Sequence, residues 1–168
     1  MNKKYFFKGG VGILSCQTED DGISNAESFH FFPREAIEEL NFITWGSTIV
    51  TDEDWVRENE KEFDFFVKER EHCILSKEQL GEVHKIIREN PEKTFWILGS
   101  EEIIQNFLPY SDRILVLRIY PKGKFSSSKF FPFFRDNFEI IGKGKFQKEK
   151  KLPYQTEMWK RNKKTLEK

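Results

Sequence analysis

The chain has 168 residues, with 28 basic and 28 acidic side chains and a formal net charge of zero. This length fits one domain over residues 1–168 that buries a substantial core, and phenylalanine, with 18 residues, supplies much of the apolar material. The apolar runs are too short to span a membrane, and the balanced charge argues against a nucleic-acid partner. Cys16, Cys73 and the three histidines show no metal-ligand spacing, so we expect no metal.

Strand and helix patterns alternate along most of the chain. Apolar residues at helical spacing after Pro33, and a capping pair formed by Ser76 and Gln79, mark the starts of two helices. Near the C-terminus the helical signals fade and two strand patterns follow each other, which is typical of a hairpin. We therefore expect an α/β fold with a mainly parallel central sheet, flanking helices and a C-terminal antiparallel hairpin. The predicted strands are 11–16, 48–51, 73–75, 94–98, 113–120, 138–146 and 154–160, and the predicted helices are 34–44, 52–71, 76–89 and 101–108.

Residues 95–109 carry the most informative signal. An apolar run meets Gly99 and turns into a short amphipathic segment that ends at Pro109, and Asp112 and Arg113 then open another apolar run. This pattern indicates a buried strand that leads into a helix N-terminus. Phosphate groups are commonly bound at such a position in α/β proteins.

The order of these signals resembles the dihydrofolate reductase family, in which a strand ends in Gly-Gly, a helix ends in Leu-Pro and Asp-Arg opens the next strand. Here Ser100 stands at the second glycine. The resemblance extends along nearly the whole chain, and it implies a dihydrofolate-reductase-like fold in a cytoplasmic enzyme that reduces dihydrofolate with NADPH. Further matching segments are 20–23 before the active-site loop, Phe31 at a tryptophan position, 44–46 at the end of the first helix, and 130–132 at a Phe-Pro signature.

The resemblance implies that a buried carboxylate at the start of the first helix grips the pterin and promotes its protonation, because burial raises the pKa of such a group. Glu35 is the candidate for this catalytic role. A gap-free alignment, however, places Ala36 at the carboxylate position, and one residue on a helix is a rotation of about 100°. Glu35 is therefore either a displaced catalytic acid or a first-turn glutamate favoured by the helix dipole.

Other residues match the family's substrate side. Phe31, Ile37 and Leu40 lie where the family lines its pterin pocket, although Ile37 and Leu40 at this spacing also fit an ordinary core. Arg70 lies where an arginine binds the carboxylate of the folate tail, a group for which guanidinium is the natural bidentate partner. It also lies in an alternating run of charges, which suits a surface arginine equally well.

The cofactor side departs further from the family. The family holds the NADPH phosphates with a Gly-Arg segment after its second strand, and here that segment is Asp52-Glu53-Asp54-Trp55, whose carboxylates would repel a pyrophosphate. Ser76 and Lys77 match the adenosine-phosphate position, where Lys77 is alternatively a surface lysine. Gly99 and Ser100 match the glycine pair beside the nicotinamide, and a serine makes the backbone geometry of that pair harder to adopt. Ile104 and Leu117 replace a tyrosine and a pterin-linked threonine of the family.

Three hypotheses follow. The first is a divergent NADPH-dependent dihydrofolate reductase, whose activity we expect to be weak or absent. The second is a catalytically degenerate homologue that acts as a binding or protein-interaction module, and the simultaneous replacement of substrate and cofactor residues favours it. The third is a reductase of another pterin-like or flavin-precursor substrate. The expected partner is a small pterin or folate, with a protein partner left open and neither nucleic acid nor membrane expected.

Overall fold

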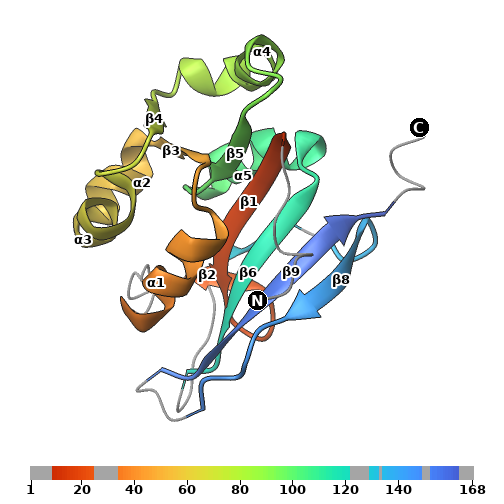
Figure 1. Ribbon diagram of the computed structural model, residues 1–168. Coiled ribbons are helices and arrows are strands. Elements are labelled where there is room, and N and C mark those ends of the chain that lie inside the picture. Colours follow the sequence, from red (N-terminus) through yellow and green to blue (C-terminus); the bar gives the residue numbers. More distant parts are fainter. Residues whose placement is uncertain (1–8, 25–33, 122–128, 133, 149–151, 163–168) are drawn as a thin grey trace.

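The computed structural model describes residues 9–24, 34–121, 129–132, 134–148 and 152–162. Its centre is a seven-stranded sheet with the strand order β4-β3-β5-β1-β6-β9-β8 (Figure 1). The strands from β4 to β6 are parallel, and β9 runs antiparallel to both β6 and β8. The seven strands are β1 Gly10–Gln17, β3 Thr48–Asp52, β4 His72–Leu75, β5 Thr94–Ile97, β6 Arg113–Ile119, β8 Phe138–Lys143 and β9 Tyr154–Arg161.

Helical segments cover both faces of this sheet. One core cluster joins sheet residues such as Leu14 and Leu115 to α1 and to the segment that carries Trp55 and Phe66. The other cluster joins the opposite face of the sheet to α4 and α5. The helical segments are α1 Arg34–Ile43, α2 Glu53–Glu58, α3 Glu60–Glu62, the π-helical η2 Phe63–Val67, the 3₁₀ turn η3 Gln79–Glu82, α4 Val83–Glu89, α5 Glu101–Phe107 and the 3₁₀ turn η4 Leu108–Tyr110.

The predicted fold class is confirmed. A mainly parallel sheet with flanking helices ends in the antiparallel pair β8 and β9, as the sequence pattern indicates. Two short strands, β2 Gly22–Ser24 and β7 Lys129–Phe130, form a separate antiparallel pair that the sequence analysis did not predict. Strands of two and three residues are too short to show an alternating pattern, which explains why they were missed.

The prediction of one helix over residues 52–71 is wrong. Asp52 belongs to β3, and the rest of the segment divides into α2, α3 and η2. Asn59 causes the first break: its backbone N–H and its side-chain amide both donate to the Trp55 carbonyl, and its backbone leaves the helical region at φ −132° and ψ 49°. Asn59 is buried, so this end of α2 is fixed by packing as well as by hydrogen bonds.

The register of the parallel strands brings the predicted cofactor segments together at the carboxyl ends of the strands. These strand ends form the edge of the sheet that is described below. Asp52 pairs with Leu75, and the backbone N–H of Leu98 donates to Val50, so that β4, β3 and β5 end side by side. Ser76 follows the first of these strands and Gly99 follows the last. Within the described ranges, no helix has the length and apolar character needed to cross a membrane.

Candidate functional site

Asp52 lies at the centre of this edge, at the end of β3. Its side chain is buried, with 3% of the residue exposed. Oδ1 accepts a hydrogen bond of 2.6 Å from the backbone N–H of Trp55, so Asp52 is the N-cap of α2. Oδ2 accepts a second hydrogen bond, of 3.1 Å, from the backbone N–H of Ser100, and a third from the Ser100 hydroxyl. One carboxylate therefore binds the starts of two helices.

Ser100 occupies the N-cap position of α5 without capping that helix through its side chain. Its hydroxyl donates to Asp52 instead. The backbone at Ser100 has φ −69° and ψ 170°, an extended conformation that any residue adopts, so the predicted difficulty of a serine at this position does not arise in this conformation.

Gly99 is needed at this turn because the chain packs too closely for a side chain. A Cβ at this position would collide with the side chain of Ile103 and would lie 3.1 Å from Oδ2 of Asp52. The sequence signal at Gly99 therefore correctly predicts a tight turn between a buried strand, β5, and a helix, α5. The space in front of the turn is taken by the chain's own carboxylate.

The surroundings of Asp52 are acidic. Glu53 and Asp54 form the first turn of α2, and Glu101 and Glu102 form the first turn of α5. Acidic side chains at helix N-termini stabilise the helices through their dipoles. Together they also give this edge a negative potential that opposes the approach of a phosphate group.

Ser76 and Lys77 follow β4 at the outer strand of the same edge. The backbone N–H of Ser76 donates to Oε1 of Gln79 at 3.0 Å, and its hydroxyl lies 3.3 Å from the same atom, so the reciprocal bond of the predicted capping pair is present. Lys77 is exposed, and among the described residues it has no ion-pair partner. The structure thus brings Ser76 and Ser100 to the same edge, with Asp52 between them.

A second feature is an apolar pocket beneath α1. It encloses about 200 Å³ including its open mouth, and its walls lie so close together that a water molecule does not fit between them. Ile37 and Leu40, two predicted substrate residues, line it, whereas Ala36 is fully buried in the adjoining core. Sequence reasoning did not find the opposite wall, although the aromatic residues within the acidic stretch were a visible signal. The full lining is Leu14, Ile37, Leu40, Trp55, Glu62, Phe66 and Leu98.

Two predicted residues cannot be related to this pocket. Phe31 lies outside the described residues. Glu35 is in the first turn of α1, but its side chain also lies outside the described part of the structure. The predicted catalytic role of Glu35 and the predicted substrate contact of Phe31 therefore stay predictions.

Arg70 joins the end of α1 to the pocket wall. Its Nη1 donates to Oδ1 of Asn41 at 3.0 Å and to the hydroxyl of Thr44 at 2.7 Å, and its Nη2 donates to the carbonyls of Thr44 and Ser47 at 2.5 and 3.2 Å. The guanidinium also lies 5.5 Å from the centre of the Phe66 ring. Burial lowers the pKa of Arg70. Both terminal nitrogens thus have partners at the end of α1, and the predicted contact with a folate tail would compete with them.

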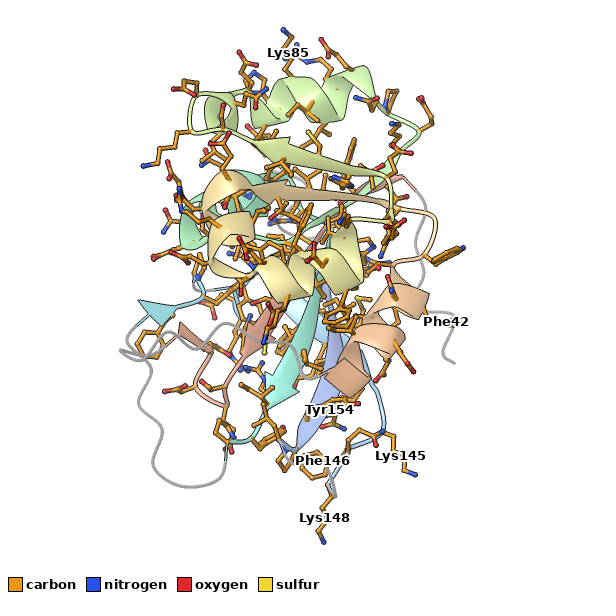
Figure 2. All side chains as sticks on the ribbon, turned by 90° about the vertical axis from the view of Figure 1, so that its left-hand side faces the viewer. Phe42, Lys85, Lys145, Phe146, Lys148 and Tyr154 are labelled. Carbon is orange, nitrogen blue, oxygen red and sulfur yellow. The ribbon has the colours of Figure 1, made fainter. Side chains whose placement is uncertain are left out.

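Phe42, on α1, lies at the right-hand margin of the molecule in Figure 2, and 57% of it is exposed. It therefore points away from the pocket that Ile37 and Leu40 line. Helix α1 contributes its buried face to the pocket and leaves this aromatic side chain in solvent.

A buried ionic cluster lies on the opposite face of the sheet. Arg118, with 3% of its side chain exposed, donates to Glu157 at 2.8 Å, to Asp21 at 2.7 Å and to the Thr18 carbonyl at 2.7 Å. Arg135 holds Asp21 from the solvent side with hydrogen bonds of 2.8 and 2.9 Å. This cluster fixes the turn that precedes β2, the segment that resembles the entry to the family's active-site loop.

Within the described residues, Cys16 and Cys73 form no disulfide, and both are partly buried. Burial raises the pKa of the Cys16 thiol to about 12, against an opposing effect of Arg118, so the thiol is protonated at neutral pH. Within the described ranges, no group of three or more histidine, cysteine or acidic side chains could hold a metal ion.

The chain is similar in structure to dihydrofolate reductase from Enterococcus faecalis, solved in complex with NADP(H) and RAB-propyl. The TM-score is 0.67, the sequence identity is 14%, and the match covers 94% of this chain and 99% of the other. No protein-family model and no curated protein matches the sequence. The structural likeness shows that this chain has a dihydrofolate-reductase-like fold.

Proposed function

We propose that this chain is a divergent dihydrofolate-reductase-like protein that binds a pterin-like heterocycle against the face of α1 that Ile37 and Leu40 form, where the facing side chains must move apart to admit the ring, with NADPH-dependent reduction of dihydrofolate weak or lost. The observation that carries the proposal is the contact between Asp52 and Ser100, which fills the turn that the family resemblance assigns to the cofactor. The pocket itself is built from buried apolar side chains, the usual lining of a small-molecule site.

The residues that line the pocket beneath α1 support ligand binding. Ile37 and Leu40 face the same pocket as Trp55 and Phe66, which gives apolar and aromatic contacts to a planar ring. We assign Ile37 and Leu40, with Phe31, to the binding wall, and keep Glu35 as a candidate for the acid. Arg70 has a supporting part in this proposal, because it fastens α1 to the segment that presents Phe66.

The cofactor side does not fit a dinucleotide pyrophosphate in this conformation. The backbone N–H of Ser100, the donor nearest the turn, already binds Oδ2 of Asp52. A second anion there would face the buried carboxylate and the acidic first turns of α2 and α5. Ser76, Lys77, Gly99 and Ser100 would serve a nucleotide only if Asp52 moved out of the turn.

A second candidate function is NADPH-dependent reduction with Asp52 displaced by the cofactor. The likeness to an enzyme solved with NADP(H) favours it. So does Lys77, which is exposed and has no ion-pair partner among the described residues. A cytoplasmic location and a protein partner stay predictions under either candidate.

Thermal melting of the purified protein separates the two candidates. A ligand present at a hundred times its dissociation constant stabilises the fold by about 2.7 kcal/mol, which raises the melting midpoint of a chain of this size by roughly 5 to 10 °C. We expect an antifolate of the 2,4-diaminopteridine class to raise the midpoint and NADPH to leave it unchanged. A shift with NADPH supports the second candidate, and no shift with either compound contradicts both.

A further inference from the structure

A net charge of zero conceals a separation of charge along the chain. Residues 138–168 hold ten basic and four acidic side chains, a net charge of +6, whereas residues 1–137 hold 18 basic and 24 acidic ones, a net charge of −6. Five lysines and one glutamate fall within residues 143–151 alone. Because the interaction between exposed charges fades over roughly 10 Å at 0.1 M salt, such a local cluster attracts a partner independently of the total charge.

The part of this cluster that the structure describes is residues 143–148, the basic hairpin, which leads from the end of β8 toward β9. Its lysines, Lys143, Lys145 and Lys148, are exposed, and among the described residues none of them has an ion-pair partner. Figure 2 shows Lys145, Phe146 and Lys148 together at the lower end of the molecule. The hairpin thus presents three cations to the solvent at one end of the protein.

Hydrogen bonds to β9 hold the backbone of the basic hairpin in place. The backbone N–H of Gly144 donates to the Thr156 carbonyl at 2.9 Å, and that of Gln147 donates to the Tyr154 carbonyl at 2.8 Å. The side-chain amide of Gln155 donates to the Gly144 carbonyl at 2.9 Å. The lysines therefore project from an ordered backbone, so that a ligand loses less free energy to ordering the hairpin when it binds.

Phe146 presents an aromatic ring between these lysines, and 40% of the residue is exposed. Its ring packs edge-to-face against the ring of Tyr120, directly after β6, with the centres 5.1 Å apart and the planes at 74°. This contact fixes the orientation of the Phe146 ring and keeps it against the protein. A ring held in this way can stack on a flat partner, whereas insertion into a bilayer needs a side chain that projects freely.

We propose that the basic hairpin is a binding surface for single-stranded nucleic acid, in which the lysines contact phosphates and Phe146 stacks on a base. Lysine ammonium groups bind phosphates as point charges. Cationic grooves with exposed aromatic side chains are the usual means by which proteins bind single strands without sequence preference. This surface is separate from the pocket beneath α1, and the proposal does not rest on a pterin ligand.

The test of the charges is fluorescence anisotropy of a labelled oligothymidylate of about 12 nucleotides, titrated with the full-length protein at about 50 mM salt. Lys145→Glu/Lys148→Glu reverses two charges of the basic hairpin. Lys85→Glu/Arg88→Glu is the matched control, because it makes the same change of charge at two exposed positions of α4. Lys85 lies at the opposite end of the molecule from the hairpin in Figure 2.

The test of stacking uses Phe146→Leu, which keeps an apolar side chain and removes the flat ring. Phe130→Leu, at another exposed phenylalanine, is its control. An abasic oligomer of the same length keeps the phosphates and lacks the bases. A melting curve of each variant shows whether it folds like the wild-type protein.

We expect the wild-type protein to bind the oligothymidylate in the micromolar range. Three lysine–phosphate contacts predict a loss of about tenfold or more between 50 and 200 mM salt. The charge reversal in the hairpin should weaken binding by about tenfold or more, and the reversal on α4 should change it by less than about threefold. Phe146→Leu should weaken binding by about fivefold or more, the lower end of the contribution of one stacked base, while Phe130→Leu leaves it unchanged. The abasic oligomer should bind more weakly than the oligothymidylate.

Three results would overturn the proposal. The first is no binding by the wild-type protein at about 50 mM salt, or an equal loss from the two charge reversals. The second is full binding by Phe146→Leu, which would leave a cationic patch with no stacking site. The third is tighter binding to phosphatidylserine vesicles than to the oligomer, retained in Phe146→Leu, which would assign the hairpin to a membrane surface.

Discussion

The carboxylate of Asp52 accepts hydrogen bonds from both the backbone N–H and the hydroxyl of Ser100, a residue 48 positions further along the chain. The contact joins the ends of two adjacent parallel strands, β3 and β5. The Asp52 carboxylate thus occupies the turn before α5, the position at which the family resemblance predicts a bound cofactor. The contact therefore stabilises the ends of these strands from within, and a buried carboxylate at this turn opposes the approach of a phosphate group.

Releasing this contact should favour a nucleotide. In the double variant Asp52→Ser/Glu53→Arg, the serine still caps α2 but is too short to hold Ser100, and the arginine supplies the missing cation. We expect NADPH to bind at least tenfold more tightly than to the wild-type protein in an equilibrium fluorescence titration. Glu53→Arg alone is the control and should give a smaller gain. Equal binding by the double variant and this control would show that Asp52 does not block the edge.

Gly99 should tolerate no side chain. In Gly99→Ala the added Cβ meets Ile103 and approaches the Asp52 carboxylate, and such overpacking costs about 1 to 3 kcal/mol. Since 1 kcal/mol corresponds to about 2 to 4 °C in a chain of this size, the melting midpoint should fall by several degrees. Gly81→Ala is the matched control, because a Cβ there meets nothing within 4 Å and the midpoint should stay level or rise slightly.

Arg70→Lys should lower stability. A lysine cannot reproduce the four hydrogen bonds that the guanidinium makes to Asn41, Thr44 and Ser47, so we expect a loss of about 1 to 3 kcal/mol in chemical denaturation. Arg57→Lys changes an exposed arginine and should be nearly neutral. If Arg70→Lys melts like the wild-type protein and loses only ligand affinity, Arg70 is a substrate clamp and the supporting role assigned to it is wrong.

The ionic cluster of Asp21, Arg118 and Arg135 predicts how the stability of the fold falls as the pH is lowered. Burial raises the pKa of Asp21, but the hydrogen bonds and charges of Arg135 and Arg118 together lower it by more, so the net pKa is below its usual value. A lowered folded-state pKa adds stability that is complete above the unfolded-state pKa of about 4 and is lost as the pH falls through the folded-state value. Asp21→Asn, which also tolerates the positive φ of 63° at this position, should therefore be less stable than the wild-type protein at pH 7.

This difference should shrink as the pH is lowered from about 5 toward 3. The measurement is the free energy of unfolding of both proteins by urea at a series of pH values. A difference that stays constant over this range would contradict an ionised Asp21 in the cluster.

Thr51→Val should preserve or increase stability. The Thr51 hydroxyl is fully buried and has no hydrogen-bond partner in the described structure. A buried polar group without a partner costs about 1 to 3 kcal/mol, and valine has nearly the same shape without that group. We expect the melting midpoint to rise by a few degrees. Thr44→Val is the contrast and should lower it, because the Thr44 hydroxyl donates to the Leu40 carbonyl at 2.8 Å and accepts from Arg70.

The sequence predicted the sheet and most helices because burial produced their periodic patterns. Ile37 and Leu40 fall at helical spacing and form the buried face of α1, which is also the pocket wall. Gly99 and Pro109 delimit a turn and a helix through local backbone restrictions. Predictions of this kind need no knowledge of distant contacts.

The role of Asp52 was not predictable in the same way. It lies in an acidic stretch whose composition is typical of a solvent-exposed helix, and local propensity gave no reason to separate it from Glu53 or Asp54. Ser100, in the turn between β5 and α5, donates to the buried carboxylate of Asp52, a contact with a residue 48 positions away. Phe66 reaches the pocket wall because Asn59 ends α2 and the chain continues into a π-helix, a change of direction that has no pattern in the sequence.

The most direct test of the central claim is an equilibrium titration of the wild-type protein with NADPH and, separately, with a 2,4-diaminopteridine, followed by tryptophan fluorescence. Trp55 lines the pocket and would report a ring bound there. We predict saturable binding of the diaminopteridine and no saturable binding of NADPH. Saturable binding of NADPH to the wild-type protein, with Asp52 intact, would contradict the account.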